Sequence, residues 1–498
     1  MRIFSSPLLR AAGLLLIGAA AAFPAVTLPA LFSDHMVLQR GLPVHLWGSA
    51  EPGETITAGF RDETRRATAD GLGLWNIYFP PGAAGGPFVL TVAGSNQIRL
   101  QDLLVGDVWV GSGQSNMEMP MKGVDHAAEE IAASTNPGIR LFQVPRKVSD
   151  YPLADMAATS WTLCRPDTVA TFSAAAYFFG RHIQKQENVP IGLIASSWGG
   201  TPAEAWTSLP ALSADASLMP VFAEWGKMMQ AQPRTLLQRD RQWQATRAKA
   251  AAEGKPAPPR PWSANEGNSW QPAGLFNGMI APLTPFPIRG VIWYQGESNA
   301  SAERAALYAR LFQTLIRDWR QAWNQSDLPF FFVQLPNFKT GPNSAWPALR
   351  DAQTQALSLA NTGMAITIDI GNPTNIHPTD KQDVGLRLAL AAEAITYGGK
   401  LEYSGPLYRL SVPENGALRV WFEHAANLSA KGATLEGFEV AGADRKFVPA
   451  AARIEKDSVL VSNPSVAAPL YARYGWADDP RCNLINGAGL PASPFQSQ

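Results

Sequence analysis

Residues 111–118 are Gly111-Ser112-Gly113-Gln114-Ser115-Asn116-Met117-Glu118. They follow directly on the apolar run 103–110, which is typical of a buried strand, and they place Ser115 where a helix can begin. A serine on such a turn lies at the carboxyl edge of a sheet, where open α/β sheets bind their ligands. The unpaired N–H groups at the start of a helix also favour a developing negative charge. This segment alone fits either an acyl-transfer nucleophile or an ordinary turn between two elements.

The composition narrows the class of partner. The 498 residues carry 41 basic and 41 acidic side chains, and only 16% of the chain is charged. This balance argues against nucleic acid and against an electrostatic membrane patch, so we expect a small or neutral ligand. The chain also holds 16 Trp, ten Tyr and 22 Phe. Aromatic side chains stack on sugar rings, although most of them fill the core of a protein of this size.

The first residues have the pattern of a targeting segment. Arg2 and Arg10 give a basic start, residues 11–22 are apolar, and small residues stand at Ala20 and Ala22. We therefore predict a cleaved secretory signal over 1–22 and a secreted or periplasmic protein, with no membrane span in its mature part. Cys164 and Cys482 are too few for a disulfide scaffold; in an oxidising compartment they are either bridged to each other or free.

The chain divides into three predicted parts. Residues 23–103 alternate apolar and polar side chains in short runs separated by turn residues, which indicates an N-terminal β-sandwich. Residues 399–498 return to short alternating runs and predict a C-terminal β-rich unit. A Gln-, Arg- and Pro-rich stretch at about 213–271 interrupts the middle of the chain and is expected to be a surface insertion.

The middle part, residues 104–398, predicts a three-layer α/β/α domain. Its apolar runs are too continuous for strands with one wet face: 105–110, 189–195, 290–294, 329–335 and 364–370. Helical patterns lie among them at 174–185, 302–323, 348–360 and 381–397. Alternating strands and helices of this kind form a parallel sheet covered on both faces.

Three further loops follow predicted strands and carry polar chemistry. Loop 196–206 contains Gly199 and Gly200, which allow backbone N–H groups to approach a ligand oxygen. Loop 293–299 contains Gln295, a possible side-chain oxyanion donor, and loop 369–378 contains His377. Of the six histidines, His377 is the best general base by elimination, because the others lie in the β units, within a helix or just before one. No group of side chains has metal-ligand spacing, so no metal and no cofactor are expected.

Taken together, the motifs resemble the conserved blocks of the sialate O-acetylesterases, a branch of the SGNH hydrolases. The resemblance spans about residues 28–495 and rests on Gly113-Gln114-Ser115-Asn116-Met117, Trp198-Gly199-Gly200-Thr201-Pro202, Trp293-Tyr294-Gln295-Gly296-Glu297-Ser298-Asn299 and Ile376-His377-Pro378. The opening segment 31–40 and the closing segments 483–487 and 490–495 also match. This resemblance implies that the middle domain has an SGNH-hydrolase-like fold.

The resemblance also implies roles for individual residues. Ser115 would be the nucleophile and His377 the base, and the oxyanion donors would be the N–H of Ser115, an N–H of Gly199 or Gly200, and the side chain of Gln295. Other SGNH hydrolases carry an aspartate three residues before the histidine, where this chain has Thr374. The third member is therefore open: Asp369, Asp380 and Asp383 are nearby in sequence, and a backbone carbonyl is an equal alternative.

The function implied is that of a secreted carbohydrate O-acetylesterase that works through a serine acyl-enzyme. The family implies acetylated sialic acid as substrate, and an acetylated hemicellulose such as xylan or xyloglucan is the alternative. A protein that only binds sugars is a third hypothesis, which the intact Ser115 and His377 disfavour.

Overall fold

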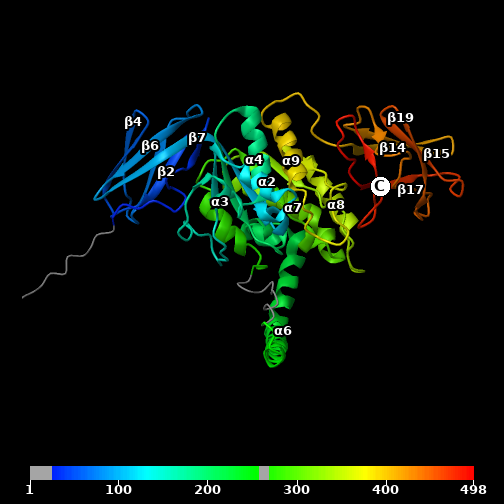
Figure 1. The fold of residues 1–498 in the computed structure, drawn as a ribbon, viewed down its shortest axis with the longest axis horizontal. Coiled ribbons are helices and arrows are strands. Elements are labelled where there is room, and N and C mark those ends of the chain that lie inside the picture. The colour runs from blue at the N-terminus through cyan, green and yellow to red at the C-terminus, as the bar shows by residue number, and fades with distance from the viewer. Residues whose placement is uncertain (1–24, 257–268, 498) are drawn as a thin grey trace, which may run out of the picture.

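The computed structural model describes residues 25–256 and 269–497, without the side chains of 232–237. The predicted signal segment, 1–22, lies outside this range. Figure 1 shows three units in a row: a β unit at the N-terminal end, an α/β unit in the middle and a second β unit at the C-terminal end. No helix in the described part of the chain is long and apolar enough to cross a membrane.

The N-terminal unit consists of two sheets that pack on each other. Strands β2 (Val44–Ser49) and β5 (Leu74–Phe79) form an antiparallel pair. The other sheet contains β1 (Val37–Gln39), β3 (Thr55–Phe60), β4 (Glu63–Thr68), β6 (Gly85–Ala93) and the first half of β7 (Gln97–Gly113). Strand β7 continues into the middle unit without a break, so the domain boundary predicted between 103 and 104 falls inside one strand.

The second half of β7 lies at the centre of the middle sheet. The strand order is β13-β12-β11-β7-β10-β8-β9, and every neighbouring pair is parallel except β8 and β9 at one edge. The bounds are β8 Asn136–Gln143, β9 Thr162–Cys164, β10 Ile191–Ser197, β11 Gly290–Tyr294, β12 Phe330–Val333 and β13 Thr362–Ala365. Strands β10 to β13 are buried along their whole length, because helices cover both faces of the sheet.

Two pairs of long helices form the outer layers. Helices α4 (Ala174–Glu187) and α9 (Lys381–Ile395) cover one face, where Phe179 packs edge-on against Trp109 of β7. Helices α7 (Ala302–Ala322) and α8 (Trp346–Thr354) cover the other face, where Phe312 packs on Trp293 of β11. The predicted α/β class with flanking β units is therefore confirmed.

The remaining helices are short, with one exception. Their bounds are α1 Ser115–Glu118, α2 Ala127–Ala132, α3 Pro166–Val169 and α5 Leu209–Ser213. Helix α6 (Met219–Ala252) makes up most of the predicted insertion at 213–271, and Figure 1 shows it projecting away from the body of the molecule.

The C-terminal unit is a second pair of antiparallel sheets with its own apolar core. One sheet has the order β14-β15-β20-β19, the other β18-β17-β21-β23, and β16 pairs with β22. Their bounds are β14 Leu407–Glu414, β15 Ala417–Glu423, β16 Ser429–Ala430, β17 Phe438–Ala441, β18 Val448–Pro449, β19 Ala451–Glu455, β20 Ser458–Ser462, β21 Tyr471–Tyr474, β22 Leu484–Ile485 and β23 Phe495–Gln496. Cys164 and Cys482 are both free.

Candidate active site

Ser115 stands at the junction of the central strand and a short helix. Strand β7 ends at Gly113 and α1 begins at Ser115. Gly113 has a φ of +132°, and a Cβ at this position would collide with the carbonyl oxygen of Tyr294 on β11, so the turn requires glycine. The N–H of Gln114 donates to that same oxygen at 3.0 Å. These contacts hold Ser115 at the middle of the carboxyl edge of the sheet.

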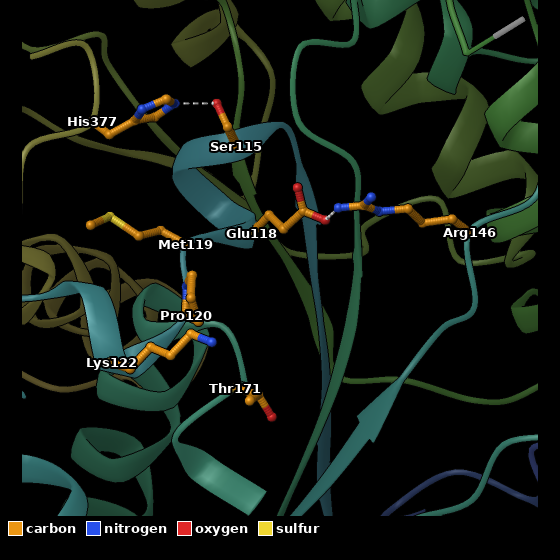
Figure 2. A pocket seen from close by; sticks show the side chains of 8 residues that line it. All are labelled: Ser115, Glu118, Met119, Pro120, Lys122, Arg146, Thr171 and His377. Atoms are coloured by element: carbon orange, nitrogen blue, oxygen red, sulfur yellow. Dashed lines mark hydrogen bonds and ion pairs between the residues drawn. The ribbon is translucent and has the colours of Figure 1, made fainter. Parts of the chain in front are cut away.

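His377 reaches this edge from a distant part of the sequence. It lies in the loop between β13 and α9, and its Nε2 is 2.8 Å from Oγ of Ser115, as Figure 2 shows. A hydrogen bond within this loop stabilises its turn: the side-chain oxygen of Asn375 accepts from the backbone N–H of His377 at 3.0 Å. The structure thus brings together the two residues that the sequence singled out as nucleophile and base, which lie 262 positions apart.

The surroundings of His377 favour the neutral form of its ring. Partial burial lowers the pKa of His377, and the nearby positive charge of Lys381 lowers the pKa further. A neutral imidazole can accept a proton at Nε2 from the Ser115 hydroxyl, provided that the other ring nitrogen, Nδ1, carries the hydrogen. The contact therefore has the geometry and the protonation state that general-base catalysis needs.

The three candidate carboxylates are engaged elsewhere. Asp369 accepts from Arg387 at 2.6 and 2.9 Å, and Asp383 accepts from the same guanidinium at 2.9 Å. Asp380 caps the start of α9 by accepting the N–H of Asp383 at 2.9 Å. None of them hydrogen-bonds to His377, and Nδ1 of His377 has no partner, carboxylate or backbone carbonyl, among the described residues.

Gly199 of the predicted oxyanion loop lies against Ser115. A Cβ on Gly199 would stand 3.2 Å from the Cβ of Ser115. However, the N–H of Gly199 donates to Oε2 of Glu118 at 2.8 Å, so in this conformation a carboxylate occupies that donor. The backbone N–H groups of Ser115 and Gly200 have no hydrogen-bond partner in the part of the chain that the structure describes. These two remain available to a ligand oxygen.

Gln295 is placed differently from the expectation. Its side chain is fully buried, and its amide nitrogen donates to the carbonyl of Thr201 at 3.2 Å and to the side chain of Asn299 at 2.7 Å. Its amide oxygen accepts from the hydroxyl of Tyr308 at 2.8 Å. Both hydrogens of the amide are thus used within the protein. Gln295 thus links loop 196–206 to loop 293–299. To donate to a ligand, its amide would have to break these hydrogen bonds.

A cavity of about 490 Å³ opens beside Ser115 and His377. Figure 2 shows the eight residues that line it: Ser115, Glu118, Met119, Pro120, Lys122, Arg146, Thr171 and His377. Arg146 forms an ion pair with Glu118 and lies over the ring of Trp198, 5.4 Å from its centroid. Lys122 has no ion-pair partner among the described residues.

Apart from Ser115 and His377, the sequence did not indicate the residues that line this cavity. Glu118 carries the one local signal, because it lies three residues after Ser115 and so one helical turn along the same face of α1. Arg146 comes from the loop after β8 and Lys122 from the short 3-10 helix Met121–Gly123 that follows α1, and no local pattern links either to Ser115.

Comparisons with known proteins agree on one family. The family profile of a carbohydrate esterase, the sialic acid-specific acetylesterase, matches residues 263–396. The sialate O-acetylesterase of Mus musculus is 31% identical over 93% of each chain, and that of Homo sapiens is 29% identical over 93% of this chain and 91% of its own. A crystal structure of a carbohydrate acetylesterase from Xanthomonas citri superposes with a TM-score of 0.82 at 37% identity, and the match covers 95% of this chain and all of that one.

Proposed function

This chain belongs to the sialate O-acetylesterase family and is a carbohydrate acetylesterase, and from this premise we propose that Ser115 and His377 carry out the hydrolysis. The observation that carries the assignment is the 2.8 Å contact between Ser115 Oγ and His377 Nε2 beside an open cavity. Both residues lie at the carboxyl edge of one parallel sheet, Ser115 at the start of α1 and His377 in the loop before α9, where α/β proteins assemble their sites.

Acyl transfer follows from this pair. Ser115 Oγ attacks the acetyl carbonyl carbon while its proton passes to His377 Nε2. The tetrahedral intermediate then collapses, the bond to the sugar oxygen breaks, and that oxygen takes the proton from His377. A water molecule attacks the acetyl-Ser115 ester, gives its proton to His377 and releases acetate and free Ser115. Each proton taken by His377 is returned, so no further acid or base is needed.

The negative oxygen of the intermediate needs donors. The N–H of Ser115 stands at the start of α1, and the N–H of Gly200 belongs to the loop packed on Ser115; both are without a partner among the described residues. Backbone donors fixed before the reaction begins stabilise such an oxyanion without reorganisation. Release of Gly199 from Glu118 would add a third donor, and Gln295 remains a prediction as a fourth.

For the substrate we propose an acetylated sialic acid. Lys122 and Arg146 place two cations around the cavity against the single carboxylate of Glu118. A sugar that carries its own carboxylate gains a charge-assisted contact there, whereas a neutral hemicellulose unit does not. The family profile points the same way, because its description is specific to sialic acid. The basic and apolar start of the sequence supports action after export from the cytoplasm.

Acetate release from a panel of substrates tests this assignment. We expect higher kcat/KM on O-acetylated sialic acid than on acetylated xylan or xyloglucan, and turnover of p-nitrophenyl acetate. The variant Lys122→Gln should raise KM for the acetylated sialic acid by about tenfold, the size of one charge-assisted contact of ~1.4 kcal/mol, and leave p-nitrophenyl acetate unaffected. Faster release from xylan or xyloglucan would move the assignment to a hemicellulose. Absence of any ester hydrolysis by folded protein would support a protein that only binds sugars.

A further inference from the structure

Among the residues that the structure describes, His377 lacks the partner that orients the histidine in many serine hydrolases. A carboxylate on Nδ1 normally fixes the tautomer and the direction of the ring. Here no carboxylate within 25–256 or 269–497 hydrogen-bonds to the ring, and Asp369 and Asp383 face Arg387 instead. The ring nevertheless stands 2.8 Å from Ser115 Oγ. Its position must therefore be fixed by the backbone that carries it.

The backbone carbonyl before His377 is held by the residue that follows the nucleophile. Asn116 is fully buried, and its amide nitrogen donates to the carbonyl of Ile376 at 2.9 Å and to Oε1 of Glu297 at 2.6 Å. Its amide oxygen accepts from Nζ of Lys381 at 2.8 Å. Both donor hydrogens and the acceptor of this one side chain are used, so its orientation is fixed.

The carbonyl after His377 is held from the other side. Lys381 is the first residue of α9, and its ammonium donates to the carbonyl of Pro378 at 2.6 Å as well as to Asn116. The helix does not need this lysine as a cap, because the side chain of Asp380 already accepts the N–H of Asp383. The contacts of Lys381 are directed at the loop that carries His377.

Placing an ammonium here is costly. Lys381 is fully buried, and burial lowers its pKa to about 7. Glu297 supplies a compensating charge across Asn116, and the ring of Tyr294 lies 5.4 Å from Nζ. Lys381 is held by two carbonyl-type acceptors, one beside His377 and one beside Ser115. An apolar side chain would fill the same space without the cost of burying a charge. The contacts of the lysine are explained if they fix the position of the loop that carries His377 relative to Ser115.

We propose that Asn116 and Lys381 are positioning residues that align His377 with Ser115 by holding the backbone carbonyl on each side of the histidine, and that Glu297 is a positioning residue that acts by fixing the side chain of Asn116. This inference rests on the proposed function, since it assigns no new reaction. Asn116 is covalently next to Ser115, so the same side chain sets the distance between the two reacting residues. A misplacement of about 1 Å at such a pair can cost about 100-fold in rate.

The variant Lys381→Met tests the proposal, because methionine keeps an unbranched apolar side chain of similar length and lacks the ammonium donors of lysine. We expect kcat on p-nitrophenyl acetate to fall by about 10- to 100-fold, with KM within threefold of wild type. Loss of the ammonium also removes one cause of the low pKa of His377, so the acid limb of the kcat/KM profile should move to higher pH. A purely structural role for Lys381 would lower stability and leave kcat unchanged at pH values well above the pKa of His377, where the change in charge no longer alters the protonation of the ring.

Arg320→Met is the matched control. Arg320 is also buried and also donates to backbone carbonyls, those of Leu328 at 3.0 Å and Ala360 at 2.6 Å. These carbonyls precede β12 and β13 and so lie at the amino edge of the sheet, opposite the site. The control should lower the melting temperature and leave kcat and the pH profile unchanged.

Two outcomes overturn the proposal: a folded Lys381→Met variant with kcat within twofold of wild type, or an equal loss of kcat in Arg320→Met. If Lys381→Met does not yield folded protein, Asn116→Ala is judged by the same two criteria. Ser115→Ala, assayed in parallel, separates the two levels of the account. An inactive Ser115→Ala beside a fully active Lys381→Met rejects the positioning role alone, whereas an active Ser115→Ala rejects the proposed function itself.

Discussion

At the scale of single residues, the site depends on one short contact whose chemistry is set by burial. His377 must be neutral to take the proton of Ser115, and its surroundings lower its pKa below the ordinary value of about 6.5. The direction differs from that of a triad histidine, in which an adjacent carboxylate stabilises the imidazolium. In this chain the cation of Lys381 acts on the ring instead, and it disfavours the imidazolium.

This lowered pKa predicts the pH dependence of the reaction. Activity requires the neutral ring, so it is retained as the pH falls until the pKa of His377 is reached and is lost below it. We expect the acid limb of kcat/KM on p-nitrophenyl acetate to have its midpoint below about pH 6.5. A pH titration of initial rates, with protein integrity checked by fluorescence, measures it. A midpoint well above 6.5 would mean that a carboxylate raises the pKa of the histidine after all.

The residue scale is also where prediction from sequence reached its limit. Ser115 and His377 could be selected because a serine at a strand-to-helix turn and a loop histidine each have a local signature. The hydrogen-bond partners of Gln295 and Gly199 could not be predicted in the same way. Whether an amide faces a ligand or its own loops depends on partners such as Thr201 and Glu118, which come from other segments. Asn116 and Lys381 are 265 positions apart, and no periodic pattern in the sequence indicates that two such distant residues are in contact.

At the scale of elements, helix α9 anchors the loop that carries His377. Arg387 on α9 binds Asp369 on the loop side and Asp383 on its own helix. Asp380 begins the helix as its N-terminal cap. The three aspartates therefore fix where the helix starts and how the loop enters it, and none of them contacts the ring of His377.

This arrangement predicts a mild phenotype for all three aspartates. Asp369→Asn, Asp380→Asn and Asp383→Asn should each keep kcat within about tenfold of wild type, far above His377→Ala, because none of the three side chains contacts the ring of His377 and the amide oxygen can still accept one hydrogen bond at each position. For comparison, loss of a true triad aspartate costs about 10⁴ in kcat. The check is kcat for the three variants with their melting temperatures alongside. A loss of three orders of magnitude or more in one folded variant would identify it as a third catalytic member.

Most elements were predictable from hydrophobic pattern, and the exceptions have a physical reason. The continuous apolar run at 290–294 corresponds to β11 residue for residue, and the run at 189–195 overlaps β10, which begins and ends two residues later; such runs are predictable because strands buried on both faces need no polar position. Strand β8, Asn136–Gln143, was missed. It begins with Asn, Pro and Gly, is partly exposed over its first half, and has only a short apolar run at its end.

At the scale of the whole molecule, strand β7 joins the N-terminal unit to the middle unit, and buried polar contacts join the middle unit to the C-terminal unit. Arg350 of α8 is fully buried and donates to four backbone carbonyls, those of Leu335 and Pro336 in the middle unit and of Ala477 and Asp478 in the C-terminal unit. The loop after β12 continues this link, since Asn337 contacts both Asp479 and the N–H of Gly371. The C-terminal unit thus packs behind the loop that carries His377. The sequence pattern predicted that a C-terminal β unit exists. Its contacts with the middle unit could be seen only in the structure, because the residues that make them are far apart in the sequence.

The central claim is that Ser115 is the nucleophile of this carbohydrate acetylesterase. The direct test is kcat for Ser115→Ala on an O-acetylated sugar and on p-nitrophenyl acetate, in protein whose melting temperature equals that of wild type. We predict a fall of about four to six orders of magnitude, the same fall for His377→Ala, and no further loss in the double variant, because nucleophile and base act as one unit. Ser115→Ala protein with a native melt and wild-type kcat would contradict the account.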